Sequence, residues 1–226
     1  VFILFVFSKM PDSNDKSSSK NIGVIFKKLV KNSLYSQGVI AQIFYVGAQI
    51  MCWTYIYQYS EGIGIDNVTA GYYQMAAFIL FVVGRAVATF LFRFFNPGKL
   101  LMIFALFAIV ASLGVMLIDN YMGLYCLVAV SLFMSLMFPT IYGIALGDLS
   151  EEESKIGSAG LVMAIVGGAL MPKFQGMIID IGGYNVDDVS ILGMSEMNFS
   201  FILPLLCFIF IAFYGLKSNT IIKNSH

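Results

Sequence analysis

The sequence predicts an all-α integral membrane protein with six full membrane-spanning helices. The 226 residues are 59% hydrophobic and only 12% charged, whereas a soluble domain normally carries about twice that share of charge. The apolar residues also fall in runs of about 20, the length that crosses a hydrocarbon core about 30 Å thick. Such runs are helices, because barrel strands are about ten residues long and alternate in polarity.

Four parts follow from this pattern along the chain. Residues 1–8, VFILFVFS, resemble the end of a membrane span that begins upstream, because no basic signal-peptide region precedes them. We expect a polar linker at 9–37, a six-helix membrane domain at 38–216 and a tail at 217–226. Within the linker, residues 22–34 fit either a short amphipathic helix on the membrane surface or a solvated loop with some helix. The spans are expected at roughly 38–60, 71–95, 99–118, 121–147, 157–179 and 198–216.

Lysine and arginine predict the orientation of the spans, because cytoplasmic connections carry an excess of both. They occur in the linker, in alternate connections and in the tail: Lys9, Lys16, Lys20, Lys27, Lys28, Lys31, Arg93, Lys99, Lys155, Lys217 and Lys223. The opposite connections, 61–70, 119–120 and 180–197, contain neither residue. We therefore expect a multi-pass plasma-membrane protein whose linker and C-terminus are cytoplasmic.

One face of the first full span carries polar and aromatic side chains at helical spacing: Gln42, Tyr45, Gln49, Trp53 and Tyr57. Four of them offer uncharged hydrogen bonds and Trp53 adds a flat apolar face, a mixture that suits a sugar. The alternative is hydrogen bonding between helices together with an interfacial aromatic belt. A belt explains the tyrosines near the end of the span but not the glutamines, so we interpret the stripe as the wall of a polar cavity.

The second span places Gln74, Phe78, Phe81 and Arg85 on one face. Arg85 lies near mid-membrane, where a charge costs at least about 2.5–3.5 kcal/mol. Such a charge must be paired or reach water. Arg85 therefore either binds a substrate or partner acid directly, or stabilises the bundle through a buried pair.

A third stripe lies in the fourth span and comprises Ser131, Ser135, Pro139 and Tyr142. Pro139 lacks a backbone N–H and can open the helix there. Serines in membrane helices often bond their own backbone, which is the simpler interpretation of the two serines. We assign Tyr142 to the cavity, and Ser135 stays a candidate because of its place in the stripe.

The fifth span has small residues and a proline at intervals of four: Gly160, Ala164, Gly168, Pro172 and Gly176. This ridge predicts close packing against another helix rather than a binding site.

Several classes of function lack their residues in this chain. Every acid lies at the end of a span or in a connection, so no carboxylate is expected at mid-membrane. No nucleophile with a base, metal cluster or phosphate-binding glycine loop is present, and the net charge of zero implies no nucleic-acid partner. We expect neither an enzyme nor a bound cofactor or metal.

Several segments carry a resemblance that extends over about residues 35–215. They are GVIAQIFYVGAQIMCW, IYQY, NPGKLLM, LYCLVAVSLFMSLMFPTIYGIAL and GSAGLVMAIVGGALMP. Together they resemble the C-terminal half of the fucose and related hexose carriers of the major facilitator superfamily. The resemblance implies a twelve-helix protein made of two six-helix halves, of which this chain supplies the end of helix 6 and helices 7 to 12.

The resemblance also implies a function: import of L-fucose or a related hexose with protons, by alternating access. In that family the coupling acids lie in the N-terminal half, and the proton gradient takes the place of a cofactor. The implied partners are the sugar, the lipid bilayer of a bacterial inner membrane and the N-terminal half of the same protein. Alternatives are a glucose or galactose carrier, a uniporter and a non-transporting sugar sensor. The cavity positions that match the family pattern are Gln42, Gln49, Trp53, Arg85 and Tyr142.

Overall fold

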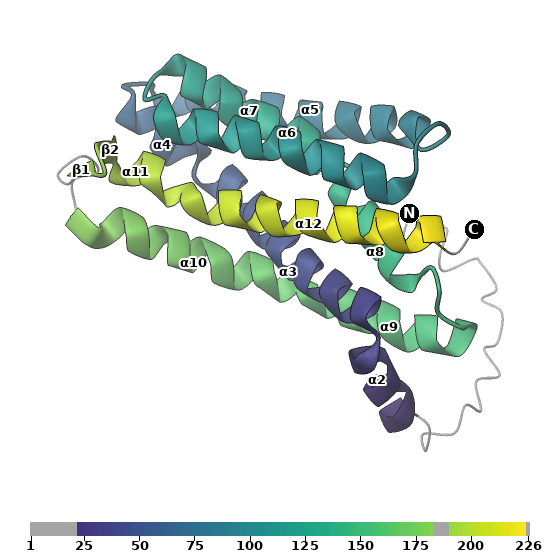
Figure 1. Ribbon diagram of the computed structural model, residues 1–226. Helices are drawn as coiled ribbons and strands as arrows, with labels where there is room; N and C mark the ends of the chain where they lie inside the picture. Colours follow the sequence, from purple (N-terminus) through teal and green to yellow (C-terminus); the bar gives the residue numbers. More distant parts are fainter. Residues whose placement is uncertain (1–21, 183–189, 225–226) are drawn as a thin grey trace, which may run out of the picture.

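The computed structural model describes residues 22–182 and 190–224, so the expected stub at 1–8 and the linker up to residue 21 lie outside the described residues. Long helices run lengthwise through one bundle (Figure 1). Five stretches are long and apolar enough to cross a membrane: α5 (Asn67–Leu91), α6 (Pro97–Leu117), α7 with α8 (Tyr121–Leu146), α9 to α10 (Glu151–Ile179) and α11 with α12 (Glu196–Thr220).

The sixth candidate span is the bent pair of α3 (Ser33–Thr54) and α4 (Ile56–Gly62), which meet at 41°. The expected six-helix arrangement is thus confirmed within the described part of the chain. The ends of some spans differ from expectation. The first span begins at Ser33, and α12 (Ile202–Asn224) continues as helix through most of the expected tail.

Three further spans are interrupted. The fourth consists of α7 (Tyr121–Met134) and α8 (Met137–Leu146). The fifth consists of α9 (Glu151–Met163), the 3₁₀ turn η1 (Ala164–Val166) and α10 (Gly167–Ile179), and the sixth has a short α11 (Glu196–Ser200) before α12. The connection before α11 contains η2 (Asp180–Gly182) and an antiparallel hairpin of β1 (Ser190–Ile191) and β2 (Met194–Ser195).

Polar side chains fix the first turns of the helices, because the first backbone N–H groups of a helix have no partner within it. Asn32 accepts hydrogen bonds from Leu34 and Tyr35 at the start of α3. Asp66 caps α5, and Asn96 caps α6 just before Pro97, which suits a first helical position. The sequence therefore marks the residues at which these helices begin.

The two ends of the bundle differ in charge. One end, here called the basic end, holds the linker helix α2 (Ile22–Lys31), the α5–α6 and α8–α9 connections and the end of α12 (Figure 1). Apart from Arg85 and Lys173, the lysines and arginines whose side chains the structure describes lie there: Lys27, Lys28, Lys31, Arg93, Lys99, Lys155 and Lys217. The opposite end holds α4, the α6–α7 connection and the hairpin. The alternation expected from the basic residues is therefore present in the fold.

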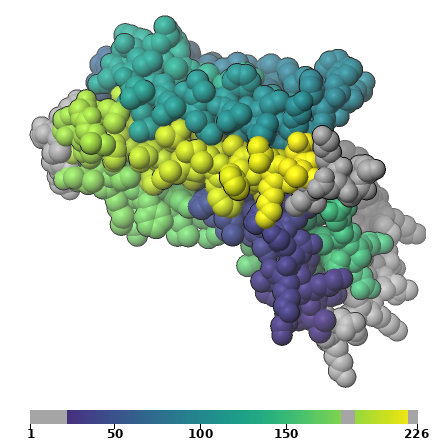
Figure 2. Space-filling model, viewed as in Figure 1, coloured from purple at the N-terminus to yellow at the C-terminus, as the bar shows by residue number. Residues whose placement is uncertain are grey.

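The span formed by α3 and α4 occupies the middle of the bundle. α3 packs against α12 on one side and α10 on another, while α12 also packs along α6, and α5 packs against α7. In the space-filling view α12 lies in the groove between α6 and the α3–α10 side (Figure 2). The core is apolar and includes Met51, Leu101, Leu127, Met134 and Phe208.

The small-residue ridge of the fifth span packs against α3, as its spacing predicts. A Cβ added at Gly160 would meet the Tyr35 hydroxyl at 2.3 Å, and one at Gly168 would meet Val46 at 3.0 Å. The closest approach is made by Gly167, whose added Cβ would lie 2.1 Å from the backbone oxygen of Ile43. Helices this close leave no room for a side chain, which explains the composition of the ridge.

Candidate functional site

The polar stripe of the first span changes from closed to open along its length. Gln42 and Tyr45, near the basic end, have no exposed surface, while Gln49 and Trp53 are half-buried. Tyr57, which follows the bend on α4, is 39% exposed. Within the described part of the chain the stripe is therefore accessible mainly toward the end opposite the lysines.

Trp53 is held in place from two neighbouring helices. Its indole Nε1 donates a hydrogen bond of 3.1 Å to Ser131 Oγ on α7. Its ring meets those of Phe78 and Phe81 on α5 edge to face, with centroids 4.9 Å and 5.2 Å away. Because the indole N–H is already used, Trp53 offers an incoming molecule an apolar ring rather than a donor.

Pro139 creates an acceptor that Arg85 uses. In a regular helix the N–H of residue 139 would bond to the carbonyl of residue 135, but proline has no N–H. The helix breaks between Met134 and Met137, and the carbonyl oxygen of Ser135 accepts a hydrogen bond of 3.2 Å from Arg85 Nε. The kink in the fourth span thus positions the charge carried by the second.

Gly84 allows this arrangement because it brings α5 very close to α7. A Cβ added to Gly84 would lie 2.6 Å from Ser135 Oγ and 2.7 Å from the backbone oxygen of Leu132. The Arg85 guanidinium carbon also lies 5.0 Å from the centre of the Phe81 ring, a cation–π contact. Arg85 remains exposed, and no carboxylate in the described part of the chain forms an ion pair with it.

Tyr142 lies on α8 and is connected to the stripe through Phe138. The rings of Phe138 and Tyr142 are stacked, with centroids 6.3 Å apart, and Phe138 meets Tyr45 of α3 edge to face at 6.1 Å. Tyr142 is half-buried. Tyr142 and Phe138 of α8 therefore form an aromatic cluster with Tyr45, which is fully buried.

The structure thus brings most of the expected site residues into two neighbouring groups. Trp53, Arg85 and Ser135 are connected across α3, α5 and α7, while Tyr45 and Tyr142 share contacts with Phe138. Gln42 belongs to neither group. The two polar atoms of its amide are buried and have no hydrogen-bond partner. This closed position comes from packing between helices, which the spacing along one helix does not reveal.

The two serines of the fourth span differ in what their hydroxyls do. Ser135 Oγ donates to the carbonyl of Leu132 in its own helix at 2.7 Å, as the simpler interpretation held. Its backbone oxygen, rather than its hydroxyl, reaches Arg85. Ser131 instead accepts from Trp53, so it positions a ring that we assign to the site.

A cavity that our sequence analysis missed lies beside Pro139, toward the basic end. It has a volume of about 410 Å³ and lies between α8, the start of α3 and the α5–α6 connection. Its lining is Leu34, Phe92, Pro97, Pro139, Thr140, Gly143, Ile144, Gly147 and Asp148. The spacing of four between Pro139, Gly143 and Gly147 is the signal that predicts a hollow face on α8.

Carboxylates of the described residues lie toward the two ends of the bundle, as expected. Glu196 is the unusual one, because it has no exposed surface and neither of its carboxylate oxygens has a hydrogen-bond partner. It stands at the start of α11, at the end opposite the lysines. Among the described residues no group of three or more histidine, cysteine or acidic side chains is arranged to hold a metal ion.

A bundle of six apolar spans with a polar, partly exposed wall is the architecture of half a membrane transporter. The family model of the Major Facilitator Superfamily matches residues 1–172, and the chain belongs to this family. It is 46% identical over 99% of its length to the L-fucose-proton symporter of Haemophilus influenzae and 30% identical over 81% to that of Escherichia coli. A glucose/galactose transporter of Brucella abortus is 30% identical over 79% of the chain.

Solved structures agree with the sequence relatives. A crystal structure of the Escherichia coli fucose:proton symporter FucP matches 96% of this chain with a TM-score of 0.81 and 28% identity. A crystal structure of a Major Facilitator Superfamily transporter, FucP, in the outward conformation matches it with the same coverage, TM-score and identity. The chain spans about half the length of the relatives it matches: 50% of the Haemophilus protein, 43% of the Escherichia coli symporter and 41% of the Brucella transporter. It corresponds to the C-terminal six-helix half of a twelve-helix transporter.

Proposed function

We propose that this chain is the C-terminal half of a secondary active transporter that imports L-fucose or a related hexose together with protons. The observation that carries the proposal is the 46% identity, over 99% of the chain, to an L-fucose-proton symporter. Alternating access would take place around a cavity between this half and an N-terminal half. The proton gradient would drive import without a cofactor, and the coupling acid would lie in the N-terminal half.

The site supports a sugar as the substrate. Trp53 presents an apolar ring that suits the face of a sugar, and Arg85 presents an exposed guanidinium that can donate to hydroxyls or pair with an acid of the other half. Tyr142 adds a hydroxyl on the α8 wall. In our proposal Gln49 faces the same path, and Gln42 and Tyr45 form its closed inner end.

The exposure of the stripe supports a direction for the path. Because lysines and arginines gather in cytoplasmic connections, we place the basic end in the cytoplasm of a bacterial inner membrane. The stripe opens toward the opposite end, which is then outside the cell. The bent pair α3–α4, with Trp53 just before the bend, would then line the outer part of the path.

A glucose or galactose carrier is the second candidate, because a relative of that name is 30% identical to the chain. L-fucose is a 6-deoxy sugar of the L series, so it differs from glucose and galactose in the handedness of the ring and lacks the hydroxyl at C6. Either could be served by the same aromatic ring with different hydrogen-bonding neighbours.

The experiment that distinguishes them is counterflow with the complete protein in proteoliposomes. Labelled L-fucose is added outside, with excess unlabelled L-fucose, galactose or glucose inside. Uptake that needs internal fucose identifies a fucose carrier, whereas uptake of labelled glucose or galactose in the matching arrangement identifies the second candidate. Binding of a sugar without any exchange would indicate a non-transporting sugar sensor. A proton dependence is then read from uptake with and without an imposed pH gradient.

A further inference from the structure

The linker helix α2 lies across the bundle rather than along it. It follows the direction of none of the spans in Figure 1 and projects beyond α9 at the basic end. Asn32 separates it from α3 and caps the span that follows. A helix placed in this way, where the spans leave the hydrocarbon, lies at the level of the lipid headgroups if the bundle is upright in a membrane.

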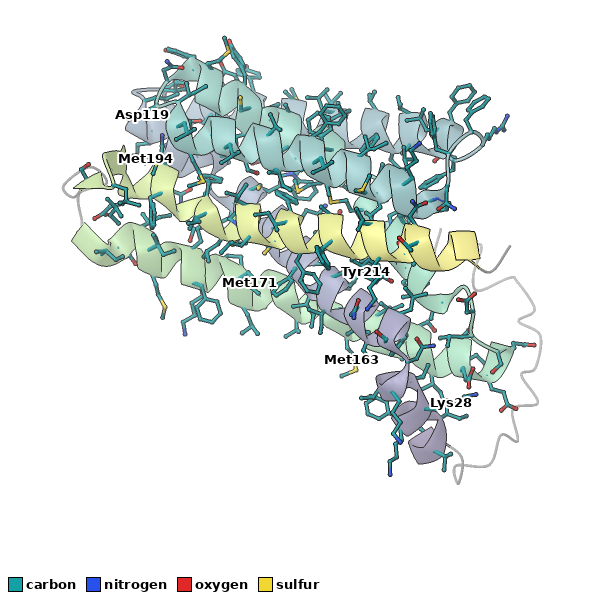
Figure 3. All side chains as sticks on the ribbon, in the orientation of Figure 1. Lys28, Asp119, Met163, Met171, Met194 and Tyr214 are labelled. Atoms are coloured by element: carbon teal, nitrogen blue, oxygen red, sulfur yellow. The ribbon has the colours of Figure 1, made fainter. Side chains whose placement is uncertain are left out.

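One side of α2 is fixed to the bundle. Leu29 is buried in a small cluster with Tyr35, Ala145 and Leu161. Lys28 forms an ion pair with Glu153 in the first turn of α9, and Figure 3 shows Lys28 projecting from α2 at this end of the bundle. The two contacts hold α2 against α8 and α9 and fix which side of the helix faces outward.

One exposed face of α2, next to the buried Leu29, is apolar. Ile22, Phe26 and Val30, which are spaced by four residues and therefore share a face, are 53%, 56% and 55% exposed. In the space-filling view the end of the chain's purple part, which includes α2, projects from the bundle (Figure 2). A row of exposed apolar side chains on a short helix needs an apolar environment to cover it.

The charge of α2 indicates which environment that is. Lys27 and Lys31 are exposed and border the apolar row on the side away from Leu29, and α2 contains no acidic residue. An apolar face bordered by lysines is the pattern of helices that lie in the surface of a bilayer with anionic lipids. The lysines carry the charge that complements the phosphate groups of such lipids.

We propose that α2 lies in the membrane interface, with Ile22, Phe26 and Val30 among the acyl chains and Lys27 and Lys31 against anionic phospholipid headgroups. The Lys28–Glu153 ion pair then connects this lipid-bound helix to the fifth span.

Labels on the two sides of α2 test the insertion. In the complete protein, cleared of other reactive cysteines and reconstituted in nanodiscs, the variants Phe26→Cys and Val24→Cys each carry an environment-sensitive fluorophore. Val24 is 68% exposed and lies on the opposite, lysine-bearing side of the helix. The label at 26 should be quenched by lipids with spin-labelled acyl chains, and the label at 24 by aqueous iodide.

Two results would overturn the insertion. Iodide quenching of both labels would show that α2 is in water. Protection of the label at 26 from both quenchers would show that another part of the protein, such as the N-terminal half, covers this face. Size-exclusion profiles matching those of the unlabelled protein ensure that the comparison is between folded molecules.

A second measurement tests the charge. Acyl-chain quenching at position 26 is compared between nanodiscs of phosphatidylcholine alone and with phosphatidylglycerol added. The double variant Lys27→Gln with Lys31→Gln is then measured in the mixed lipid. The ratio of inserted to free α2 should fall about five-fold for each lysine removed. The control removes two charges from the same end but not from α2, with Arg93→Gln and Lys99→Gln, and should have no effect. Equal quenching in both lipids, or an equal loss in the control, would refute binding of anionic headgroups by α2.

Discussion

At the scale of single residues, the candidate site depends on one missing hydrogen bond. Pro139 leaves the carbonyl of Ser135 without its usual partner, and Arg85 takes that place. A charge at mid-membrane is costly unless it is satisfied, so this contact and the Phe81 ring explain part of how Arg85 is tolerated. The exposed remainder of the guanidinium is what a sugar or a partner acid would meet.

A double-mutant cycle tests the connection between Pro139 and Arg85. Pro139→Ala restores an N–H that competes for the Ser135 carbonyl, and Arg85→Lys keeps the charge but removes the Nε–H that donates to this carbonyl. If both act through that carbonyl, the second change should weaken sugar binding less in the presence of the first, with a coupling of about 0.5–3 kcal/mol. The measurement is the binding free energy from calorimetry with the complete protein. Additive effects would separate the two residues.

Trp53→Ala should weaken sugar binding at least about ten-fold while leaving membrane insertion intact, because truncating a central aromatic contact costs about 2 kcal/mol or more. The change is read from binding to purified protein, with expression and size-exclusion profile as the check on folding. Ser131→Ala is the matched variant, since it removes the partner of the indole N–H and keeps the ring. Unchanged binding in Trp53→Ala would remove this residue from the site.

Tyr142→Phe removes one hydroxyl and keeps the ring that stacks on Phe138. If that hydroxyl contacts the sugar, counterflow should fall while the thermal stability of the protein stays the same. Tyr55→Phe is a useful contrast, because the Tyr55 hydroxyl already donates to the carbonyl of Pro172 and its loss should affect stability instead. Uptake at the wild-type level would make Tyr142 a packing residue.

At the scale of elements, the packing of the fifth span on α3 depends on glycine. Gly167→Ala would place a Cβ against the backbone of Ile43, which cannot move aside as a side chain can. We expect a loss of about 1–3 kcal/mol in the free energy of unfolding, the usual cost of overpacking. Gly143→Ala is the control: an added Cβ there meets nothing within 4 Å, so thermal unfolding in detergent should be unchanged or slightly improved. Equal effects at both positions would show that helix propensity, not packing, decides.

The breaks within the spans are also features of the elements. Pro139 predicts the break between α7 and α8, but the 3₁₀ turn at Ala164–Val166 and the bend at Tyr55 have no such marker. Both lie where α3 meets the fifth span. The 3₁₀ turn ends beside Ile43 of α3, whereas Tyr55 contacts Pro172 further along α10, so each break lies at its own contact between the two spans.

At the scale of the whole molecule, our proposal gives this chain one wall of the sugar cavity and an N-terminal half the other wall. The chain alone should therefore insert into membranes and remain folded, yet show no counterflow of any hexose. Co-expression with an N-terminal half of the same protein should restore transport. Exchange by this chain alone, in vesicles shown to contain no other carrier, would contradict the proposal that transport needs both halves.

The sequence by itself determined the membrane class, the six spans and their alternation, because lipid forces apolar runs into helices and basic residues gather at one end. It also predicted the packing role of the glycine ridge, which depends on spacing along one helix, and the break of the helix before Pro139, which depends on the missing N–H of proline. Residues such as Trp53, Arg85 and Tyr142 could be chosen because polar side chains are rare in such spans.

Only the tertiary structure decided which of those residues are open and which are closed. Gln42 and Trp53 share a helical face, yet neighbouring helices enclose the first completely and the second only in part. The pairing of Arg85 with Ser135, and of Trp53 with Ser131, joins residues 50 and 78 positions apart. Periodicity shows which face of a helix a residue occupies, but burial and partners depend on the helices that pack against that face.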